Sequence, residues 1–326
     1  MRCLKLIILL LFISIRSLCQ DPQFSQFYSN PLYLGPSFAG AVEGSRVALL
    51  YRDQWRELTS IFRVYSISYD HYFSTFNSGV GIIAYKDVAG SGQLGSMNIG
   101  LQYSYNFTVY NLWHIRPGLS FYYVEHGFFG SLLYMDELLS DLSNVDNPGT
   151  LVHDPNGPSR DIDAGSSALV YTRKFWMGTT VDHLLTPSIR LYDLESNIPV
   201  KFSLYGGYEF RRRGRLLKPS DETMTFTFMY KQQAQIEQLD LGVYWYNYPL
   251  VLGLWYRGIP FVNSDRGDAM VFLVGIKTRQ FNVGYSYDFT ISNLLLATRG
   301  SHEISLTFKF LLPKRTKKGS VPCPEF

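Results

Sequence analysis

Apolar and polar residues alternate at every second position between Gly44 and Phe310, in about a dozen short segments. The clearest segments are Met97–Phe107, Phe281–Ile291 and Ile304–Phe310. A period of two gives a β-strand one apolar face and one polar face. The apolar faces have to be buried, and the hydrocarbon tails of a membrane are the place we expect for them.

The alternation predicts about 14 strands, each with the length of a tilted membrane strand of about 9–11 residues plus extensions. They are expected at residues 45–57, 62–73, 78–88, 94–107, 112–126, 161–172, 174–185, 199–211, 223–232, 235–247, 249–258, 266–278, 279–291 and 300–311. An even number places both chain ends on the periplasmic side. The predicted fold class is therefore all-β, a single transmembrane antiparallel β-barrel.

The lengths of the connections fit this topology. If the first strand runs outward, the long connections 127–160, 186–198 and 292–299 are extracellular loops, and most connections at the other end are short turns. Long outer loops and short inner turns are typical of outer-membrane barrels. The stretch Arg212–Glu222 is a longer basic turn and departs from the rule.

The first 19 residues read as a signal peptide. Arg2 and Lys5 precede the apolar run Leu6–Ile15, which is too short to span a membrane as a helix, and cleavage is expected after Cys19. Lipidation of Cys19 is a weaker alternative, because Leu18 stands where a small residue is needed. Export by this signal leads to the outer membrane of a Gram-negative cell.

Three further regions follow the signal peptide. Residues 20–43 form a periplasmic leader interrupted by Pro22, Pro31 and Pro36. Its aromatic residues have to be buried, so we expect it to pack against the barrel, either inside the lumen or beneath it. Residues 44–311 form the barrel. Residues 312–326 form a basic periplasmic tail.

Composition supports a membrane barrel. Aromatic residues make up 16% of the chain, charged residues only 17%, and the mean hydropathy is −0.04. Polar lumen residues dilute the lipid-facing ones in a barrel, whereas a water-soluble β-protein carries more charge. The net charge of +3 comes from scattered basic residues, which argues against a nucleic-acid partner.

Motifs for catalysis or cofactor binding are weak. The string Gly90-x-Gly92-x-x-Gly95 precedes a strand rather than a helix, so a hairpin loop is favoured over a dinucleotide site. The six histidines show no metal-ligand spacing, and the acidic residues between 136 and 154 lack that of a calcium loop. No Gly-x-Ser-x-Gly elbow is present. We expect no catalytic, metal or cofactor site; a hydrolase triad spread over several strands is a minor alternative.

Two charged groups stand out. Arg52, Gln54 and Arg56 share one face of the first strand, which points inward in a barrel and permits charge pairing across the lumen. Four arginines lie at a predicted periplasmic turn, where they either meet anionic lipid headgroups or bind a periplasmic partner. They are Arg211, Arg212, Arg213 and Arg215.

Several motifs occur in a characteristic order. Gln20–Tyr33 follows the signal peptide, Tyr51–Trp55 lies in the first strand, Trp255–Gly258 and Gly284–Asp288 come late, and Gly300–Leu306 lies near the end. This order resembles the PorP/SprF family of type IX secretion system outer-membrane proteins of Bacteroidota. The positions that carry the resemblance are Asp21, Pro22, Phe24, Ser25, Gln26, Asn30, Tyr51, Arg52, Gln54, Trp55, Tyr256, Arg257, Gly258, Tyr285, Asp288, Gly300, His302 and Glu303.

The resemblance implies a non-enzymatic barrel tied to type IX secretion or gliding motility. Family members are associated with a secreted adhesin that carries a type B C-terminal domain, and some link to periplasmic components of the machine. Its partners would then be the adhesin, other type IX components and outer-membrane lipids. We expect client contacts at residues of the long outer loops, although these residues could instead plug the lumen. They are Phe128, Phe129, Tyr134, Ile189 and Tyr192. The alternative function is a transport channel for small or apolar solutes.

Overall fold

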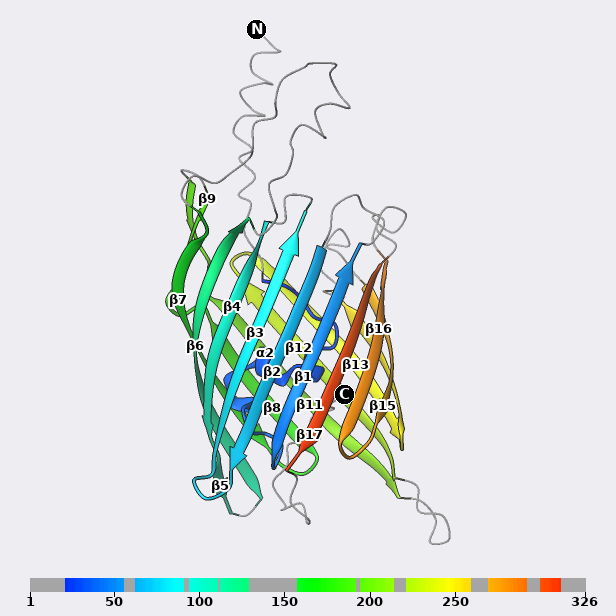
Figure 1. The fold of residues 1–326 in the computed structure, drawn as a ribbon. Coiled ribbons are helices and arrows are strands. Elements are labelled where there is room, and N and C mark those ends of the chain that lie inside the picture. The colour runs from blue at the N-terminus through cyan, green and yellow to red at the C-terminus, as the bar shows by residue number, and fades with distance from the viewer. Residues whose placement is uncertain are drawn as a thin grey trace.

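A computed structural model describes residues 21–55, 62–90, 94–110, 112–128, 157–191, 194–213, 221–258, 269–291 and 300–311. Its strands stand side by side around a closed barrel (Figure 1). They are β1 (Ser45–Gln54), β2 (Phe62–Phe73), β3 (Ser78–Ala89), β4 (Leu94–Tyr105), β5 (Phe107–Val109), β6 (Trp113–Phe128), β7 (Ser159–Tyr171), β8 (Phe175–Asp182), β11 (Lys201–Arg213), β12 (Asp221–Gln233), β13 (Ile236–Asn247), β14 (Leu250–Arg257), β15 (Ala269–Lys277), β16 (Phe281–Thr290) and β17 (Ser301–Phe310).

The barrel closes through antiparallel pairing of neighbouring strands. The first strand β1 pairs with the last strand β17, and β4 pairs with β6. The short strand β5 continues β4 beyond Asn106 and pairs with the same partner, β6. With β4 and β5 taken as one strand, the barrel has 14 strands. The predicted fold class is confirmed.

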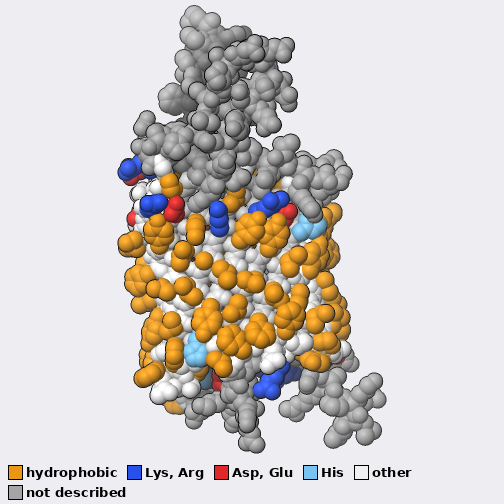
Figure 2. Space-filling model, in the orientation of Figure 1, with side chains coloured by type: hydrophobic (Ala, Val, Ile, Leu, Met, Phe, Trp, Pro, Cys, Tyr) orange, Lys and Arg blue, Asp and Glu red, His pale blue; other side chains and the backbone are white. Residues whose placement is uncertain are grey.

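Burial along the strands is the inverse of that in a water-soluble protein. On β2, Ser66, Ser68 and Asp70 are 6%, 3% and 1% exposed, whereas the alternating Tyr65 and Ile67 are 46% and 52% exposed. The polar faces therefore line the lumen, and the apolar faces point outward. Figure 2 shows these hydrophobic side chains as a broad band around the barrel, with charged side chains at its margins. This is the surface expected of a barrel in lipid.

The two ends of the barrel differ in their connections. At one end, residues 129–158, 183–200, 258–268 and 291–300 join successive strands; we call this the long-loop end. At the opposite end, most connections are as short as residues 172–174. In outer-membrane barrels the longer loops are extracellular and the short turns periplasmic.

Two connections differ from expectation. The stretch 186–198 contains a small hairpin, β9 (Ser188–Leu191) and β10 (Leu194–Asn197), instead of an uninterrupted loop. Strand β11 continues through Arg213 and β12 begins at Asp221, so the basic turn is shorter than the predicted 212–222. Consecutive arginines interrupt the alternation at the end of β11, so the predicted strand 199–211 ends two residues before the observed one.

The leader lies inside the barrel. It forms η1 (Phe27–Ser29), α2 (Pro31–Leu34) and η2 (Pro36–Phe38), and α2 is seen through the front wall in Figure 1. The prediction that it packs against the barrel is confirmed; of the two positions that the sequence left open, inside the barrel or beneath it, the structure has the first. Its chain runs from the long-loop end, at Asp21, to the start of β1 at the other end.

Close approach of the leader depends on glycines in the wall. A Cβ atom on Gly79 would stand 1.9 Å from the Ala39 carbonyl oxygen, and one on Gly118 would stand 2.4 Å from the Ser37 nitrogen. Real Cβ atoms do not approach so closely, so these positions require glycine. Among the described residues, no helix is long and apolar enough to cross a membrane.

Candidate functional site

The centre of the lumen holds a buried ion-pair cluster. The guanidinium of Arg52 on β1 lies 3.0 Å from Glu303 on β17 and 2.8 Å from Asp288 on β16. Arg257 on β14 approaches the same oxygen of Asp288 at 3.1 Å. The side chains of Arg52, Asp288 and Glu303 are at most 4% exposed. Buried charges are tolerated only when they are paired and hydrogen-bonded, as they are here.

This cluster holds the leader by its backbone. The Glu303 carboxylate accepts hydrogen bonds from the backbone N–H groups of Ser25 and Gln26, at 2.8 and 2.7 Å. The Ser25 hydroxyl donates to Asp288 at 2.6 Å, and the Gln26 amide donates to the Glu303 carbonyl at 3.0 Å. The leader thus donates hydrogen bonds to carboxylate oxygens of the wall, and its removal would leave these buried oxygens short of donors.

Aromatic packing holds the leader against β8, β11 and β14. Phe27 meets Trp255 with ring centroids 4.9 Å apart, and Tyr28 meets Trp176 at 5.0 Å. Both pairs are edge-to-face, the geometry that aromatic quadrupoles favour. Phe38 approaches Tyr205 at 5.7 Å further along the lumen. The leader therefore has a charged side, where it contacts the ion-pair cluster, and an aromatic side, where it packs on Trp176, Tyr205 and Trp255.

The end of the leader near the short turns is held by two more arginines. Arg46 pairs with Asp70 at 2.8 Å, and Asp70 also accepts the Gly40 N–H. Arg116 donates to the carbonyl oxygens of Ser37 and Ala39. Polar contacts thus accompany the leader along the whole lumen.

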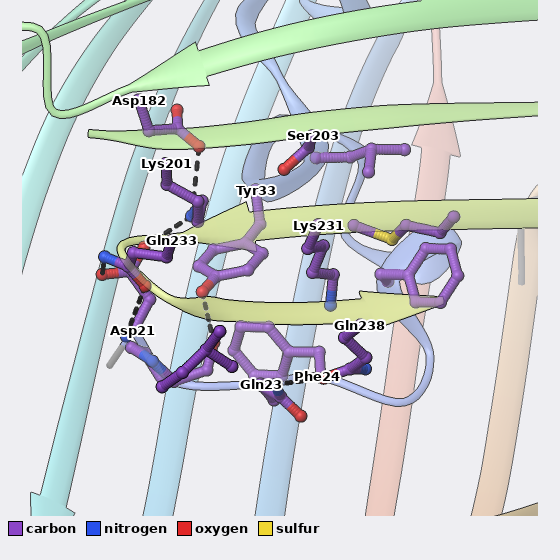
Figure 3. A pocket seen from close by; sticks show the side chains of 15 residues that line it. Asp21, Gln23, Phe24, Tyr33, Asp182, Lys201, Ser203, Lys231, Gln233 and Gln238 are labelled. Carbon is purple, nitrogen blue, oxygen red and sulfur yellow. Dashed lines mark hydrogen bonds and ion pairs between the residues drawn. The ribbon is translucent and has the colours of Figure 1, made fainter. Parts of the chain in front are cut away.

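At the long-loop end, Asp21 joins a second charged cluster. Its carboxylate contacts Lys201 and lies 3.0 Å from His183, which in turn lies 2.7 Å from Asp163. Lys201 also contacts Asp182 at 3.1 Å. Figure 3 shows Asp21, Lys201 and Asp182 joined in this way beside Tyr33. We call Asp21, Asp163, Asp182, His183 and Lys201 the mouth cluster.

A small cavity of about 50 Å³ lies between the mouth cluster and the aromatic side (Figure 3). Gln23 bridges to Gln238 across it at 2.6 Å. The Lys231 ammonium lies 5.6 Å above the ring of Phe27. The space is large enough for a water molecule or two but far below the about 300–1,000 Å³ of ordinary ligand sites. Within the described ranges, no group of three or more His, Cys, Asp or Glu side chains is arranged to hold a metal ion.

The structure brings many of the resemblance positions together. Inside the barrel, the two charged clusters and their contacts contain Asp21, Ser25, Gln26, Arg52, Arg257, Asp288 and Glu303, with Pro22, Phe24 and Asn30 beside them. The prediction that Arg52 points inward to pair with other charges is confirmed; Gln54 lies on the same face, and Arg56 is outside the described residues.

Other resemblance positions do not join the lumen. Tyr51, Tyr256, Tyr285 and His302 lie on the outward faces, where the Tyr285 hydroxyl is 2.8 Å from His302. Trp55, Gly258 and Gly300 stand at strand ends on the long-loop side, where positive φ angles turn the chain.

The predicted contact residues are only partly described. Phe128 ends β6, and Ile189 on β9 is 8% exposed, so the Ile189 side chain is packed rather than offered to solvent. Arg211 is exposed on β11 and contacts Glu209. Arg212 and Arg213 belong to the same strand. Several predicted features lie outside the described residues: the predicted signal peptide 1–19, the predicted tail 312–326, Phe129, Tyr134, Tyr192, Arg215 and the acidic residues 136–154.

Sequence reasoning missed the mouth cluster. Lys201, Asp182, His183 and Asp163 come from three separate strands and the residue that follows one of them. Alternation indicates that strand residues such as Asp163 face inward, but it does not reveal which inward residues meet across the lumen. One sequence feature pointed toward this cluster: Asp21 is a charged residue in a leader whose aromatic residues have to be buried.

A β-barrel filled by its own N-terminal segment is the class of protein that this fold and lumen define. The family described as "Type IX secretion system membrane protein PorP/SprF" matches residues 17–308. The chain therefore belongs to the PorP/SprF family of type IX secretion outer-membrane proteins. Fold and family together point to the outer membrane.

Solved structures share the barrel architecture at low identity. Omp33 of Acinetobacter baumannii has a TM-score of 0.49 at 9% identity, covering 83% of this chain and 100% of that one. The Pseudomonas putida toluene transporter TodX scores 0.47 at 9% identity, covering 84% and 91%. A Pseudomonas aeruginosa FadL homologue scores 0.47 at 11% identity, covering 82% and 90%. These likenesses concern the fold alone. No curated protein matches the chain.

The central cluster predicts a large effect of Arg52→Met. The substitution keeps an unbranched side chain but removes the guanidinium and leaves two buried carboxylates short of positive charge, so the free energy of unfolding should fall by about 3–5 kcal/mol. Urea titration of the barrel in lipid vesicles measures it. The control is Arg160→Met, because Arg160 meets Glu125 at 3.6 Å on the exposed surface and such pairs contribute less than about 1 kcal/mol. Equal small losses in both variants would contradict the assignment.

The mouth cluster predicts a pH dependence. His183 follows the last residue of β8; burial disfavours its charged form, but the charge of Asp21 and hydrogen bonds to Asp163 and Asp21 outweigh this and raise its pKa to about 10. Because the unfolded value is about 6.5, the stabilisation is complete below that pH and is lost as pH rises through 10. Between pH 7 and 10, wild-type stability should therefore fall more steeply than that of His183→Gln. Parallel urea-titration profiles for the two proteins would refute this.

Proposed function

We propose that this protein is a non-enzymatic adaptor barrel of the type IX secretion machinery. It binds a secreted adhesin with a type B C-terminal domain at the cell surface and links to periplasmic components. In this proposal residues 1–19 are a removed export signal and 312–326 a periplasmic tail. The observation that carries the proposal is the filled lumen, because a barrel without an open passage has its two ends as its working surfaces.

Contacts around the lumen support a permanently filled barrel. The leader is bound on its charged side by Glu303, on its aromatic side by Trp176 and Trp255, and near the short turns by Arg116. Clearing a passage would break these contacts together and expose the paired charges. The solute-channel alternative requires such clearing, since the cavity beside the leader holds only about 50 Å³.

The long-loop end is the surface that we assign to the client. It carries the connection 129–158, the longest between two strands, together with the β9–β10 hairpin. Aromatic residues are enriched at the energetic centres of protein interfaces, and Phe129, Tyr134 and Tyr192 lie in these connections. Ile189 supports the hairpin from its packed position rather than contacting the client directly.

The opposite end carries the arginines that we assign to a periplasmic partner. Arg211 is exposed at the end of β11, and Arg212, Arg213 and Arg215 follow it toward the turn. Exposed guanidinium groups recognise carboxylates with paired hydrogen bonds. An acidic surface on a periplasmic component would fit this group.

Deletion of residues 130–158 should abolish adhesin retention while the barrel still assembles. The tagged protein is purified in mild detergent, bound proteins are identified by mass spectrometry, and folding is checked by heat-modifiable gel migration. We expect at least a tenfold loss of adhesin, and an intermediate loss for the triple variant Phe129→Ala, Tyr134→Ala, Tyr192→Ala. Deletion of 260–266, another connection at the same end, is the control and should leave retention intact. Full adhesin retention by the 130–158 deletion would contradict the assignment of this connection to client binding.

Replacement of Arg211, Arg212, Arg213 and Arg215 by Gln should reduce recovery of periplasmic type IX components without changing that of the adhesin, because the two contacts lie at opposite ends. The matched control replaces Lys314, Arg315, Lys317 and Lys318 by Gln, which removes the same charge from the tail. If the four-arginine variant recovers periplasmic components like wild type, or if the tail variant loses as much, these arginines do not form the proposed contact.

A further inference from the structure

The outer wall carries an apolar groove that the leader and loops do not explain. It measures about 450 Å³ and is lined almost wholly by apolar atoms of β17, β1, β2, β3 and β4. Its size falls in the usual range of about 300–1,000 Å³ for small-molecule sites. It lies on the face of the barrel that we assign to the membrane, so its surroundings are hydrocarbon.

Strand register explains the groove. One outward row across β1, β2, β3 and β4 reads Leu49, Ile67, Ala84 and Ile99. Ile67 is 52% and Ile99 37% exposed, so both project from the wall, whereas Ala84 between them ends at its Cβ atom. The short side chain leaves a depression flanked by two branched ones. A flexible hydrocarbon chain is the kind of molecule that fills such a depression.

Cations lie on the side of this groove nearer to the long loops. The next row reads Tyr51, Tyr65, Lys86 and Met97, and Lys86 lines the groove. Arg63 lies two residues before Tyr65 on the same face of β2, diagonal to Lys86, and such diagonal neighbours are within reach of long side chains. Asp53 lies 3.7 Å from Arg63, so the three side chains together carry a charge of +1. Figure 2 shows Lys and Arg side chains along this margin of the hydrophobic band.

We propose that this groove binds one acyl chain of a phosphate-bearing lipid of the outer leaflet, with the phosphate held between Lys86 and Arg63. The apolar groove alone would accept any hydrocarbon. Its cationic margin, at the level where headgroups meet water, selects an anionic one, because Lys and Arg form charge-assisted hydrogen bonds with phosphate oxygens. The tyrosine rings of Tyr51 and Tyr65, 5.1 Å apart, stand at the same level, as aromatic residues do at membrane interfaces.

Two lipids with the same single acyl chain and different headgroups distinguish binding through the headgroup from binding through the chain. The full-length mature protein in non-ionic detergent is titrated with 1-palmitoyl lysophosphatidic acid and with 1-palmitoyl lysophosphatidylcholine, and binding is followed by native mass spectrometry. Wild type should bind one lysophosphatidic acid and prefer it at least tenfold. Lys86→Gln with Arg63→Gln should remove this preference. Ala84→Trp should weaken both lipids at least tenfold by filling the groove.

Control variants use another part of the wall. Ala168→Trp adds the same bulk to an exposed position of β7, and Arg160→Gln removes a surface cation from that strand. Both should bind lipid like wild type, and heat-modifiable migration verifies folding of every variant. An unchanged affinity in Ala84→Trp, or an equal loss in Ala168→Trp, would overturn the site. So would a dimer that Ala84→Trp disrupts while lipid binding persists, since the groove would then belong to a second protein.

Discussion

Pairing of the Arg52 guanidinium with Asp288 and Glu303 is the interaction on which the arrangement of this barrel depends. A charge placed inside a barrel needs partners, and β16 and β17 provide them to Arg52 only when the barrel closes β1 onto β17. The same Glu303 then accepts two backbone N–H groups of the leader. Barrel closure and leader placement are therefore linked through one carboxylate.

Alternation in the sequence predicted the barrel well because lipid exposure imposes a period of two on every strand. The predicted 62–73 matches β2 residue for residue, and most other borders shift by only a few residues. Errors arose where that pattern was absent, at the arginines of β11 and in the β9–β10 hairpin. For the leader, the sequence left a place inside the barrel and a place beneath it as open alternatives. The leader's proline breaks showed that it is irregular, but only contacts from distant strands place it in the lumen.

The charged site was foreseen in part. Arg52 was expected to face inward and pair with other charges, and motif resemblance had already drawn attention to Ser25, Asp288 and Glu303. Nothing local in the sequence indicates that these residues touch, since more than 200 positions separate Arg52 from either carboxylate. The mouth cluster escaped notice for the same reason. In the proposed function, the filled lumen leaves the two ends of the barrel as binding surfaces, and the proposed lipid groove lies on its outward wall.

Carbodiimide crosslinking of the native protein tests the position of the leader most directly. The Asp21 carboxylate contacts the Lys201 ammonium at the long-loop end, so a zero-length reagent should join them and yield a linked peptide pair in mass spectrometry. No substitution is needed, and the link can form only if the leader traverses the lumen. A leader beneath the barrel would instead leave Lys201 unlinked to Asp21 and join Asp21 to the tail lysines Lys314, Lys317 or Lys318, which would contradict the filled lumen.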